Sequence, residues 1–476
     1  MRTTKIVATL GPATDAPEIL RQILHAGVNV VRLNASHGTQ AEHARRIQAV
    51  REIARETGMN VGILLDLQGP KIRLGTFRDG GCLLETGSIF TLTTQTVEGT
   101  AETASTSYPE FARDVKPGDR VLLSDGTLEL EVLATDGIAA RCRVIRGGWI
   151  SDRKGINLPG VKVSTPSLSK KDVADAHFGV QQGVDFIAIS FVRSGKDVLR
   201  LRHLLDESDA RQPIIAKIEK PEAVQNLDSI LEEADGVMVA RGDLGVEMAL
   251  EKVPMIQKAI IERCRQLGRF VITATQMLES MVENPLPTRA EVSDIANAIY
   301  DGTGAIMLSA ETSVGKYPIQ AVEMMGKIAL ETEIAVRRQG FAKEVRLAPN
   351  PTTPQIVADA AFHVARSAEV SAIAVGTSSG ATAKLLARYR PPVPIFAFTE
   401  TEAVARQLSI IYGVEAILAP ACPSTDMMLQ QMEKLLLATG RAKSGENVVF
   451  LAGQPVNQSG TTNLLHLHRV FSSGAC

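Results

Sequence analysis

The chain has 476 residues, more than one hydrophobic core usually holds, and this length predicts about two to four domains. Its formal net charge of −2 excludes a general attraction to nucleic acid or to anionic membranes, so local positive charge must hold any anionic ligand. No apolar segment reaches the length of a membrane span, and the N-terminus starts a strand pattern rather than a signal peptide. We therefore expect a cytoplasmic protein.

The cysteines lie far apart in the sequence and form no CxxC pair. Their odd number and wide spacing predict free thiols in a reducing compartment, without a metal or catalytic role. They are Cys82, Cys142, Cys264, Cys422 and Cys476.

Strand and helix patterns alternate over residues 1–69. Apolar strand patterns occupy residues 4–10, 28–33 and 61–66, with helical patterns between them. From residue 70 to residue 166 the helical period disappears, and Gly, Pro, Asp and Thr separate short apolar runs. This spacing predicts a small all-β domain inserted into the larger one.

The alternation resumes over residues 167–345, with a helix expected after the capping sequence that begins at Ser169. Further strand patterns lie at 186–190, 214–219, 237–241, 270–275 and 305–309. With the first three, these strands predict a (β/α)₈ TIM barrel, and an open doubly wound sheet is the alternative. We expect residues 274–281 to begin the helix that follows the seventh strand.

A proline-rich segment at 349–354 opens a further domain, predicted over residues 346–476. Its strand and helix patterns are typical of an α/β fold. The strand patterns lie at 371–375, 394–398, 415–418, 447–451 and 465–470.

Charged side chains follow two neighbouring barrel strands. Lys217 and Glu219 are two residues apart and share a face of the first strand, while Asp243 follows the next strand. Parallel strands end at the same edge, so we expect these groups to meet at the barrel mouth. Two carboxylates suit Mg²⁺, which keeps positions open for water and phosphate oxygens. Ion-paired strand ends are the alternative.

Seven motifs, in the same order along the chain, resemble the signatures of the pyruvate kinase family. The resemblance covers essentially the whole chain and implies a barrel, an inserted lid and a C-terminal domain. It also implies phosphoryl transfer from phosphoenolpyruvate to ADP, giving pyruvate and ATP. The motifs lie at Arg32–Gly38, Asp66–Arg73, Lys217–Glu219, Arg241–Gly245, Thr273–Met281, Pro287–Glu291 and Met307–Thr312.

The resemblance implies a role for each matched residue at the barrel mouth. Lys217 and Arg32 would offset the charge of the moving phosphoryl group, since this chemistry needs fixed cations more than a nucleophile. Glu219 and Asp243 would hold Mg²⁺, with Mn²⁺ as a substitute. Thr275 would lie near the enolate face that is protonated. Gly242, which has no side chain, would let backbone amides approach the substrate carboxylate beside Asp243.

Further matched residues are implied to bind the nucleotide. Asn34 and Arg73 would contact its phosphates, and Lys154 would do so from the lid when the lid closes and excludes water. His37 lies within one of the motifs, but we expect it to form structural hydrogen bonds rather than to act as an acid or base.

One departure from the family pattern concerns a monovalent cation. Many pyruvate kinases bind K⁺ at the positions of Asn34, Ser36, Asp66 and Leu67 and have a carboxylate where this chain has Lys71. Two positive charges ~4 Å apart repel by several kcal/mol at intermediate dielectric. We therefore hypothesise that the ammonium group of Lys71 replaces K⁺.

A loop of small and hydroxyl-bearing residues in the C-terminal domain resembles the effector region of the family. It would bind a sugar phosphate or AMP, and an ordinary polar turn is the alternative. Its candidate residues are Thr377, Ser378, Ser379, Gly380 and Thr382.

Two other functions fit part of the sequence. A Mg²⁺-dependent lyase or aldolase that stabilises an enolate would use Glu219 and Asp243 equally well, but it needs no nucleotide site on a lid. A catalytically inactive sensor of phosphorylated metabolites would not need the intact set of Lys217, Glu219, Asp243 and Thr275. The resemblance further implies a homotetramer.

Overall fold

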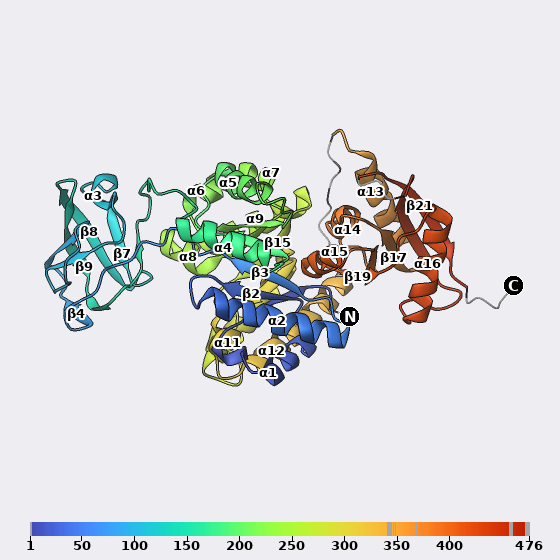
Figure 1. Cartoon of the computed structure of the whole chain (residues 1–476), viewed down its shortest axis with the longest axis horizontal. Coiled ribbons are helices and arrows are strands. Elements are labelled where there is room, and N and C mark those ends of the chain that lie inside the picture. The colour runs from blue at the N-terminus through green and yellow to red at the C-terminus, as the bar shows by residue number, and fades with distance from the viewer. Residues whose placement is uncertain are drawn as a thin grey trace.

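The computed structural model describes residues 2–339, 345, 347, 349–367, 369–456 and 460–471. Three bodies lie in a row, with the all-β domain at one end, the barrel in the middle and the C-terminal domain at the other end (Figure 1). Residue 346, at the expected junction of the barrel and the C-terminal domain, and Cys476 lie outside the described residues. Cys82, Cys142, Cys264 and Cys422 are reduced cysteines, as predicted.

The predicted (β/α)₈ barrel is confirmed between residues 5 and 308. Its parallel strands close in the order β1-β16-β15-β14-β13-β12-β3-β2. Nearly every residue of these strands is buried, because helices cover the outside of the barrel and side chains fill the inside. The strands are β1 (Lys5–Thr9), β2 (Val30–Asn34), β3 (Gly62–Asp66), β12 (Phe186–Ile189), β13 (Ile214–Ile218), β14 (Gly236–Ala240), β15 (Phe270–Ala274) and β16 (Ala305–Leu308).

The helices around the barrel begin at the predicted caps. Thr39 and Ser169 each accept a hydrogen bond from the third residue of their helix, and that residue bonds back to the cap. The helices are α1 (Pro17–His25), α2 (Gln40–Thr57), α4 (Lys170–Gln181), α5 (Gly195–Asp206), α6 (Pro221–Gln225), α7 (Leu227–Glu233), α8 (Arg241–Glu247), α9 (Val253–Leu267), α10 (Arg289–Asp301), α11 (Ala310–Ser313) and α12 (Pro318–Gln339).

The expectation that residues 274–281 begin a helix is wrong. Thr275 and Gln276 have φ angles of 69° and 54°, in the left-handed region that a right-handed helix cannot use. The chain instead forms a loop and the short 3₁₀ turn η3 (Glu279–Val282), and α10 starts only after its cap at Thr288.

The inserted domain is the predicted all-β module. Its main sheet has the order β11-β7-β8-β9-β5-β6, beside a pair formed by β10 and β4. The short helix α3 (Phe111–Asp114) packs into its core. The strands are β4 (Gly81–Leu84), β5 (Ile89–Thr93), β6 (Thr103–Ser105), β7 (Arg120–Leu123), β8 (Leu128–Thr135), β9 (Ala139–Arg146), β10 (Gly148–Ser151) and β11 (Ile156–Asn157).

The C-terminal domain has a sheet of order β19-β18-β17-β20-β21, in which β21 alone runs antiparallel to its neighbour. Helices cover both faces of this sheet (Figure 1). Its elements are α13 (Thr353–Ser367), β17 (Val370–Gly376), α14 (Ala381–Ala387), β18 (Ile395–Thr399), α15 (Glu402–Gln407), β19 (Val414–Leu418), α16 (Thr425–Ala438), β20 (Asn447–Gly453) and β21 (Thr462–Arg469).

The amino-terminal end of the barrel packs on the C-terminal domain. One apolar cluster runs from the barrel interior, with Val7 and Met238, into the C-terminal domain at Ile410. A Cβ at Gly62 would lie 2.7 Å from the Ser409 hydroxyl and 3.1 Å from the Arg406 carbonyl oxygen of this domain, so only glycine fits there. The carboxyl ends of the strands are therefore the free mouth of the barrel, and they lie on the side of the all-β domain.

Candidate active site at the barrel mouth

A buried lysine lies at the centre of the barrel mouth. Lys217, near the end of β13, forms an ion pair of 2.7 Å with Glu219 Oε1 and lies 3.5 Å from Asp66 Oδ1. Its Nζ also donates to the hydroxyl of Ser190 at 2.9 Å. Three neighbouring strands, β3, β12 and β13, therefore bring these groups together.

The carboxylates keep Lys217 charged. Burial alone would lower the pKa of Lys217, but Asp66, Glu219 and Asp243 together raise it above its ordinary value. Asp243 lies in the first turn of α8, just after β14, and acts on Lys217 from the adjacent strand end. A lysine that stays protonated at neutral pH serves as a fixed cation and not as a base.

Glu219 and Asp243 are the candidate metal ligands. Burial raises the pKa of Glu219, against the opposing effect of Lys217. One Glu219 oxygen contacts Lys217 and the other accepts from the Phe191 amide at 2.8 Å, which leaves further lone pairs on both oxygens. No group of three His, Cys, Asp or Glu residues suited to a metal exists in the described part of the chain. A two-carboxylate donor set fits a hard ion that completes its coordination with water or substrate oxygens.

Arg32 is fixed by Asp66. Its Nε and Nη2 atoms both lie 2.7 Å from Asp66 Oδ2, and Nη1 donates to the Thr9 hydroxyl at 3.1 Å. The other oxygen, Asp66 Oδ1, is buried and has no hydrogen-bond partner. Lys217 Nζ lies 3.5 Å from this oxygen. A buried carboxylate oxygen that accepts no hydrogen bond fits a further cation, whether a monovalent ion or an ammonium group.

The remaining residues of the expected monovalent site are close to Asp66. The Asn34 side chain accepts from the Ser36 amide at 3.1 Å, and the Leu67 carbonyl accepts from the Ser190 hydroxyl at 2.8 Å. Lys71 is half-buried and lines a cavity between the barrel and the all-β domain together with Asp243. Within the described residues, Lys71 has no carboxylate at ion-pair distance, so the structure does not join it to Asp66.

Thr275 and Gly242 contact each other. The Gly242 amide donates to the Thr275 hydroxyl at 2.8 Å, and that hydroxyl donates to the Ala274 carbonyl at 2.6 Å. The side chain of Thr275 is therefore oriented by two backbone groups at the ends of β14 and β15.

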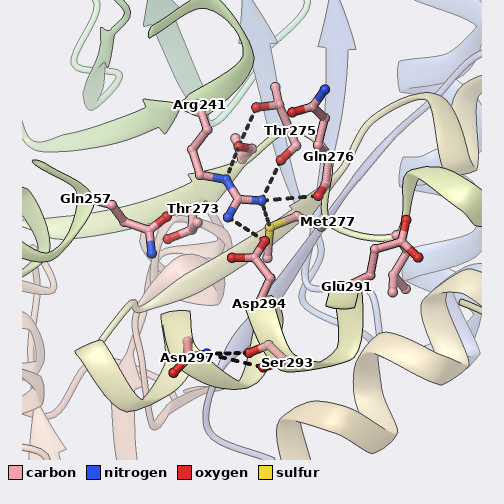
Figure 2. A network of polar contacts seen from close by, with 12 residues as sticks. Arg241, Gln257, Thr273, Thr275, Gln276, Met277, Glu291, Ser293, Asp294 and Asn297 are labelled. Atoms are coloured by element: carbon pink, nitrogen blue, oxygen red, sulfur yellow. Dashed lines mark hydrogen bonds and ion pairs between the residues drawn. The ribbon is translucent and has the colours of Figure 1, made fainter. Parts of the chain in front are cut away.

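Arg241 holds the strained loop that carries Thr275 (Figure 2). Its guanidinium donates to the Ala274 carbonyl at 3.3 Å and to the Thr275 carbonyl at 2.7 Å, and it pairs with Asp294 at 2.5 Å. A third loop carbonyl, that of Gln276, lies at 3.3 Å. These bonds stabilise the left-handed backbone at two residues that are not glycine.

The expected nucleotide contacts lie nearer the all-β domain. Arg73 Nη1 donates to the Arg153 carbonyl at 3.1 Å, and the side chain of Lys154 is exposed. Partial burial lowers the pKa of His37, and three nearby cations lower it further, namely Arg73, Lys71 and Arg32. Two candidate phosphate-binding cations, Arg73 and Arg32, and the candidate replacement for K⁺, Lys71, thus lie within electrostatic reach of one imidazole ring.

Sequence reasoning missed several residues at the mouth. Ser190 links Lys217 to the Leu67 carbonyl, and Glu247 accepts from both Lys220, at 2.9 Å, and Asn157, at 3.0 Å. The last contact joins the all-β domain to the barrel. Ser190 follows the end of β12, and other barrel strands also carry polar residues at this position. Its position in the sequence could therefore have predicted it as a site residue.

The hydroxyl-rich loop of the C-terminal domain lines a cavity of about 90 Å³. Thr377, Ser378, Ser379 and Thr382 line it, whereas Gly380 is instead the left-handed cap of α14. Among the described lining residues there is no lysine or arginine, and Glu400 adds a negative charge. A phosphate there would rely on neutral donors from these residues.

The chain was compared with known proteins. The model of the pyruvate kinase barrel domain matches residues 1–322, and that of the pyruvate kinase alpha/beta domain matches residues 355–468. Pyruvate kinases of Geobacillus stearothermophilus and Sporosarcina psychrophila are 48% and 46% identical, each over 98% of this chain and 80% of the relative. The crystal structure of a Cryptosporidium parvum pyruvate kinase has a TM-score of 0.92 at 36% identity, covering 98% of this chain and 96% of that one.

Among the described residues, no helix has the length and apolar character needed to span a membrane.

Proposed function

The chain belongs to the pyruvate kinase family, and on that premise we propose which of its residues carry the phosphoryl transfer from phosphoenolpyruvate to ADP. The observation that carries the proposal is the buried ammonium of Lys217, paired at 2.7 Å with Glu219 and kept charged by its carboxylate neighbours. A preorganised cation in a water-poor site stabilises charge far better than one in water, because it need not reorient during the reaction.

Lys217 and Arg32 act on the transferred group. Lys217 faces the phosphoryl group and then offsets the negative charge of the enolate that remains. Arg32, held rigid by Asp66, presents its remaining N–H donors to a phosphoryl oxygen. Thr275, oriented by Gly242 and Ala274, lies on the face where the enolate takes up its proton and positions the donor water. The Asp243 backbone, next to Gly242, binds the substrate carboxylate.

Members of this family use Mg²⁺ and K⁺. Glu219 and Asp243 would hold Mg²⁺ or Mn²⁺, which would supply positive charge to offset that of the reacting phosphoryl group. Asn34, Ser36, Asp66 and the Leu67 carbonyl form the monovalent site. Here the Lys71 ammonium takes the place of K⁺, which Asp66 Oδ1 favours because this buried oxygen has an ion pair with Lys217 at 3.5 Å but accepts no hydrogen bond.

Asn34, Arg73 and Lys154 bind the nucleotide phosphates when the all-β domain closes over the mouth. Closure excludes water, which would otherwise compete with ADP for the phosphoryl group. The exposed side chain of Lys154 has the freedom to reach a nucleotide from the moving domain.

The C-terminal loop of residues 377–382 binds a sugar phosphate or AMP as an effector, and its cavity of about 90 Å³ supports this role. Four copies of the chain assemble into a cytoplasmic homotetramer. Domain boundaries at residues 69, 166 and 345 are consistent with an enzyme whose lid and effector domain flank one barrel.

The alternative functions are less well supported. An aldolase would not need the nucleotide cations on the all-β domain, and an inactive sensor would not need a charged, buried Lys217. A coupled assay of pyruvate formation from phosphoenolpyruvate, ADP and Mg²⁺ distinguishes these possibilities from the proposed reaction.

The role of Lys217 is tested with Lys217→Met. We expect the turnover number to fall at least 10³-fold, because the main fixed cation is lost. Lys196→Met is the control, since it removes an exposed lysine of α5. Thermal unfolding shows whether each variant is folded. Equal activity of the two folded variants would reject the assignment.

A further inference from the structure

A second cluster of cations lies at the opposite end of the barrel from the active site. It lines a cavity of about 50 Å³ between the floor of the barrel and the C-terminal domain. The end of α9, the start of β15 and the segment before β16 form one wall, and α14 with the segment before β19 forms the other. Five cationic side chains line this interdomain pocket, and none of its described lining residues is acidic. The cations are Arg265, Arg269, Lys384, Arg388 and Arg390.

Two of these cations have structural partners. Arg269 donates to the Leu231 carbonyl at 2.9 Å, and Arg390 donates to the Thr303 carbonyl at 2.8 Å and stacks on the Tyr412 ring. Their contacts connect loops of the barrel floor and fix the walls of the pocket.

The other three cations have donor groups that the described protein residues do not satisfy. Arg265 is only 8% exposed, and its Nε and Nη2 atoms have no hydrogen-bond partner. The nearest carboxylate oxygen, on Glu262, is 3.6 Å from Nη2, beyond hydrogen-bond distance. Arg388, also 8% exposed, donates to the Tyr389 hydroxyl at 2.6 Å but leaves its Nε without a partner.

Lys384 adds a third charge from α14. Burial lowers the pKa of Lys384, since Asp235 offsets only part of the effect. In the described residues no carboxylate lies within ion-pair distance of its ammonium. Buried nitrogen atoms that make no hydrogen bond are costly, and a bound anion would satisfy those of Arg265 and Arg388.

We propose that the interdomain pocket binds the phosphate group of a small phosphorylated metabolite, with Arg265, Lys384 and Arg388 as its ligands. Guanidinium forks and an ammonium group are the donors that phosphate oxygens prefer. A wider cavity of about 300 Å³ adjoins the pocket and shares Arg265, Arg390 and Tyr412 with it. Phe362 and Pro391 line this cavity, which has room for the body of the ligand.

The pocket is separate from the hydroxyl-rich loop. That loop offers no lysine or arginine among its described lining residues, whereas the interdomain pocket offers five cations. A ligand bound here contacts both the barrel and the C-terminal domain, so it stabilises their association by mass action.

The test compares wild-type protein with Arg265→Gln/Lys384→Gln by calorimetric titration with inorganic phosphate, at constant ionic strength. The control is Arg263→Gln, which removes an exposed arginine of the same helix that pairs with Asp228. Phosphate can also bind to the cations of the active site. Binding to the interdomain pocket is therefore measured as the difference between the isotherms of the wild type and the double variant. We expect the double variant to lose one binding event or to bind at least tenfold more weakly, and the control to match the wild type.

Thermal unfolding gives a second readout. Without phosphate the double variant should unfold at a higher temperature than the wild type. The substitutions remove a buried guanidinium with two nitrogen atoms that make no hydrogen bond, and a half-buried ammonium without a carboxylate at ion-pair distance among the described residues. Saturating phosphate should raise the wild-type midpoint by roughly a few degrees more than it raises that of the variant, which keeps the active-site cations. A lower midpoint for the variant without phosphate would show a purely structural role and overturn the proposal, as would identical binding isotherms.

Titration with a sugar monophosphate and a nucleoside monophosphate distinguishes the source of the phosphate. Binding at least tenfold tighter than inorganic phosphate, and lost in the double variant, shows that the wider cavity holds an organic body. Ester binding no tighter than that of phosphate identifies free phosphate as the occupant and overturns the assignment to a metabolite.

Discussion

At the scale of single residues, the site depends on charges that are paired before any substrate binds. Arg32 and Lys217 both contact Asp66, so one carboxylate orients two cations. Such pairs are costly to break because the partner is left buried and charged. The spacing of Lys217 and Glu219 was sufficient to predict their shared face. The pairing of Arg32 with Asp66 was not predictable, since it depends on the packing of β2 against β3.

The Lys71 hypothesis is tested by restoring a carboxylate. We expect wild-type activity to change less than twofold when K⁺ replaces choline, because the ammonium already supplies the charge. Lys71→Glu should lose roughly 10²-fold in choline and regain most of it in K⁺, since a carboxylate recruits a mobile cation. The measurement is the initial rate at constant ionic strength. Strong stimulation of the wild type by K⁺ would contradict the hypothesis.

At the scale of elements, the loop after β15 shows where local patterns are insufficient. Residues 274–281 contain good helix formers, and the sequence favoured a helix there. Arg241, which lies 33 to 35 residues earlier in the chain, instead bonds the carbonyls of residues 274–276 and stabilises a left-handed turn. A tertiary contact thus overrides the local preference.

This interpretation predicts unequal effects for the two partners of the ion pair in Figure 2. Arg241→Gln should lower the turnover number about 10²-fold, because Thr275 loses its fixed position. Asp294→Asn should cost less than about tenfold, since Arg241 keeps its bonds to the loop carbonyls. Steady-state rates of the two folded variants check this. Similar losses of turnover in both variants would show that activity depends on the ion pair rather than on the bonds from Arg241 to the loop carbonyls.

At the scale of the whole molecule, the order of the domains was predictable because strand and helix periods change at clear points in the sequence. The contact between the barrel floor and the C-terminal domain was not, since its partners lie hundreds of residues apart. Lys5 illustrates this point. Its Nζ is buried and donates to the Val414 carbonyl at 2.7 Å.

Lys5 makes this contact dependent on pH. Burial lowers the pKa of Lys5 from 10.5 to about 8, so the folded protein holds this proton less tightly than the unfolded chain. The resulting destabilisation is fully present below pH 8 and disappears as the pH rises to 10.5. Relative to Lys5→Met, the wild type should therefore gain stability over this range, by about 3 kcal/mol at most.

Differential scanning calorimetry between pH 7 and pH 10.5 measures the effect as a difference in unfolding midpoint. Lys196→Met, at an exposed lysine, is the control and should show no such trend. A midpoint difference between wild type and Lys5→Met that does not change with pH would mean that Lys5 is not destabilised in the folded protein.

The central claim is that Glu219 and Asp243 hold the divalent ion beside Lys217. Titration of free Mn²⁺ by electron paramagnetic resonance tests it without relying on turnover. We expect one tight Mn²⁺ site per wild-type chain, and at least tenfold weaker binding in Glu219→Gln and in Asp243→Asn. Glu251→Gln, at an exposed carboxylate, should bind as the wild type does. Unchanged Mn²⁺ affinity in Glu219→Gln/Asp243→Asn would contradict the account.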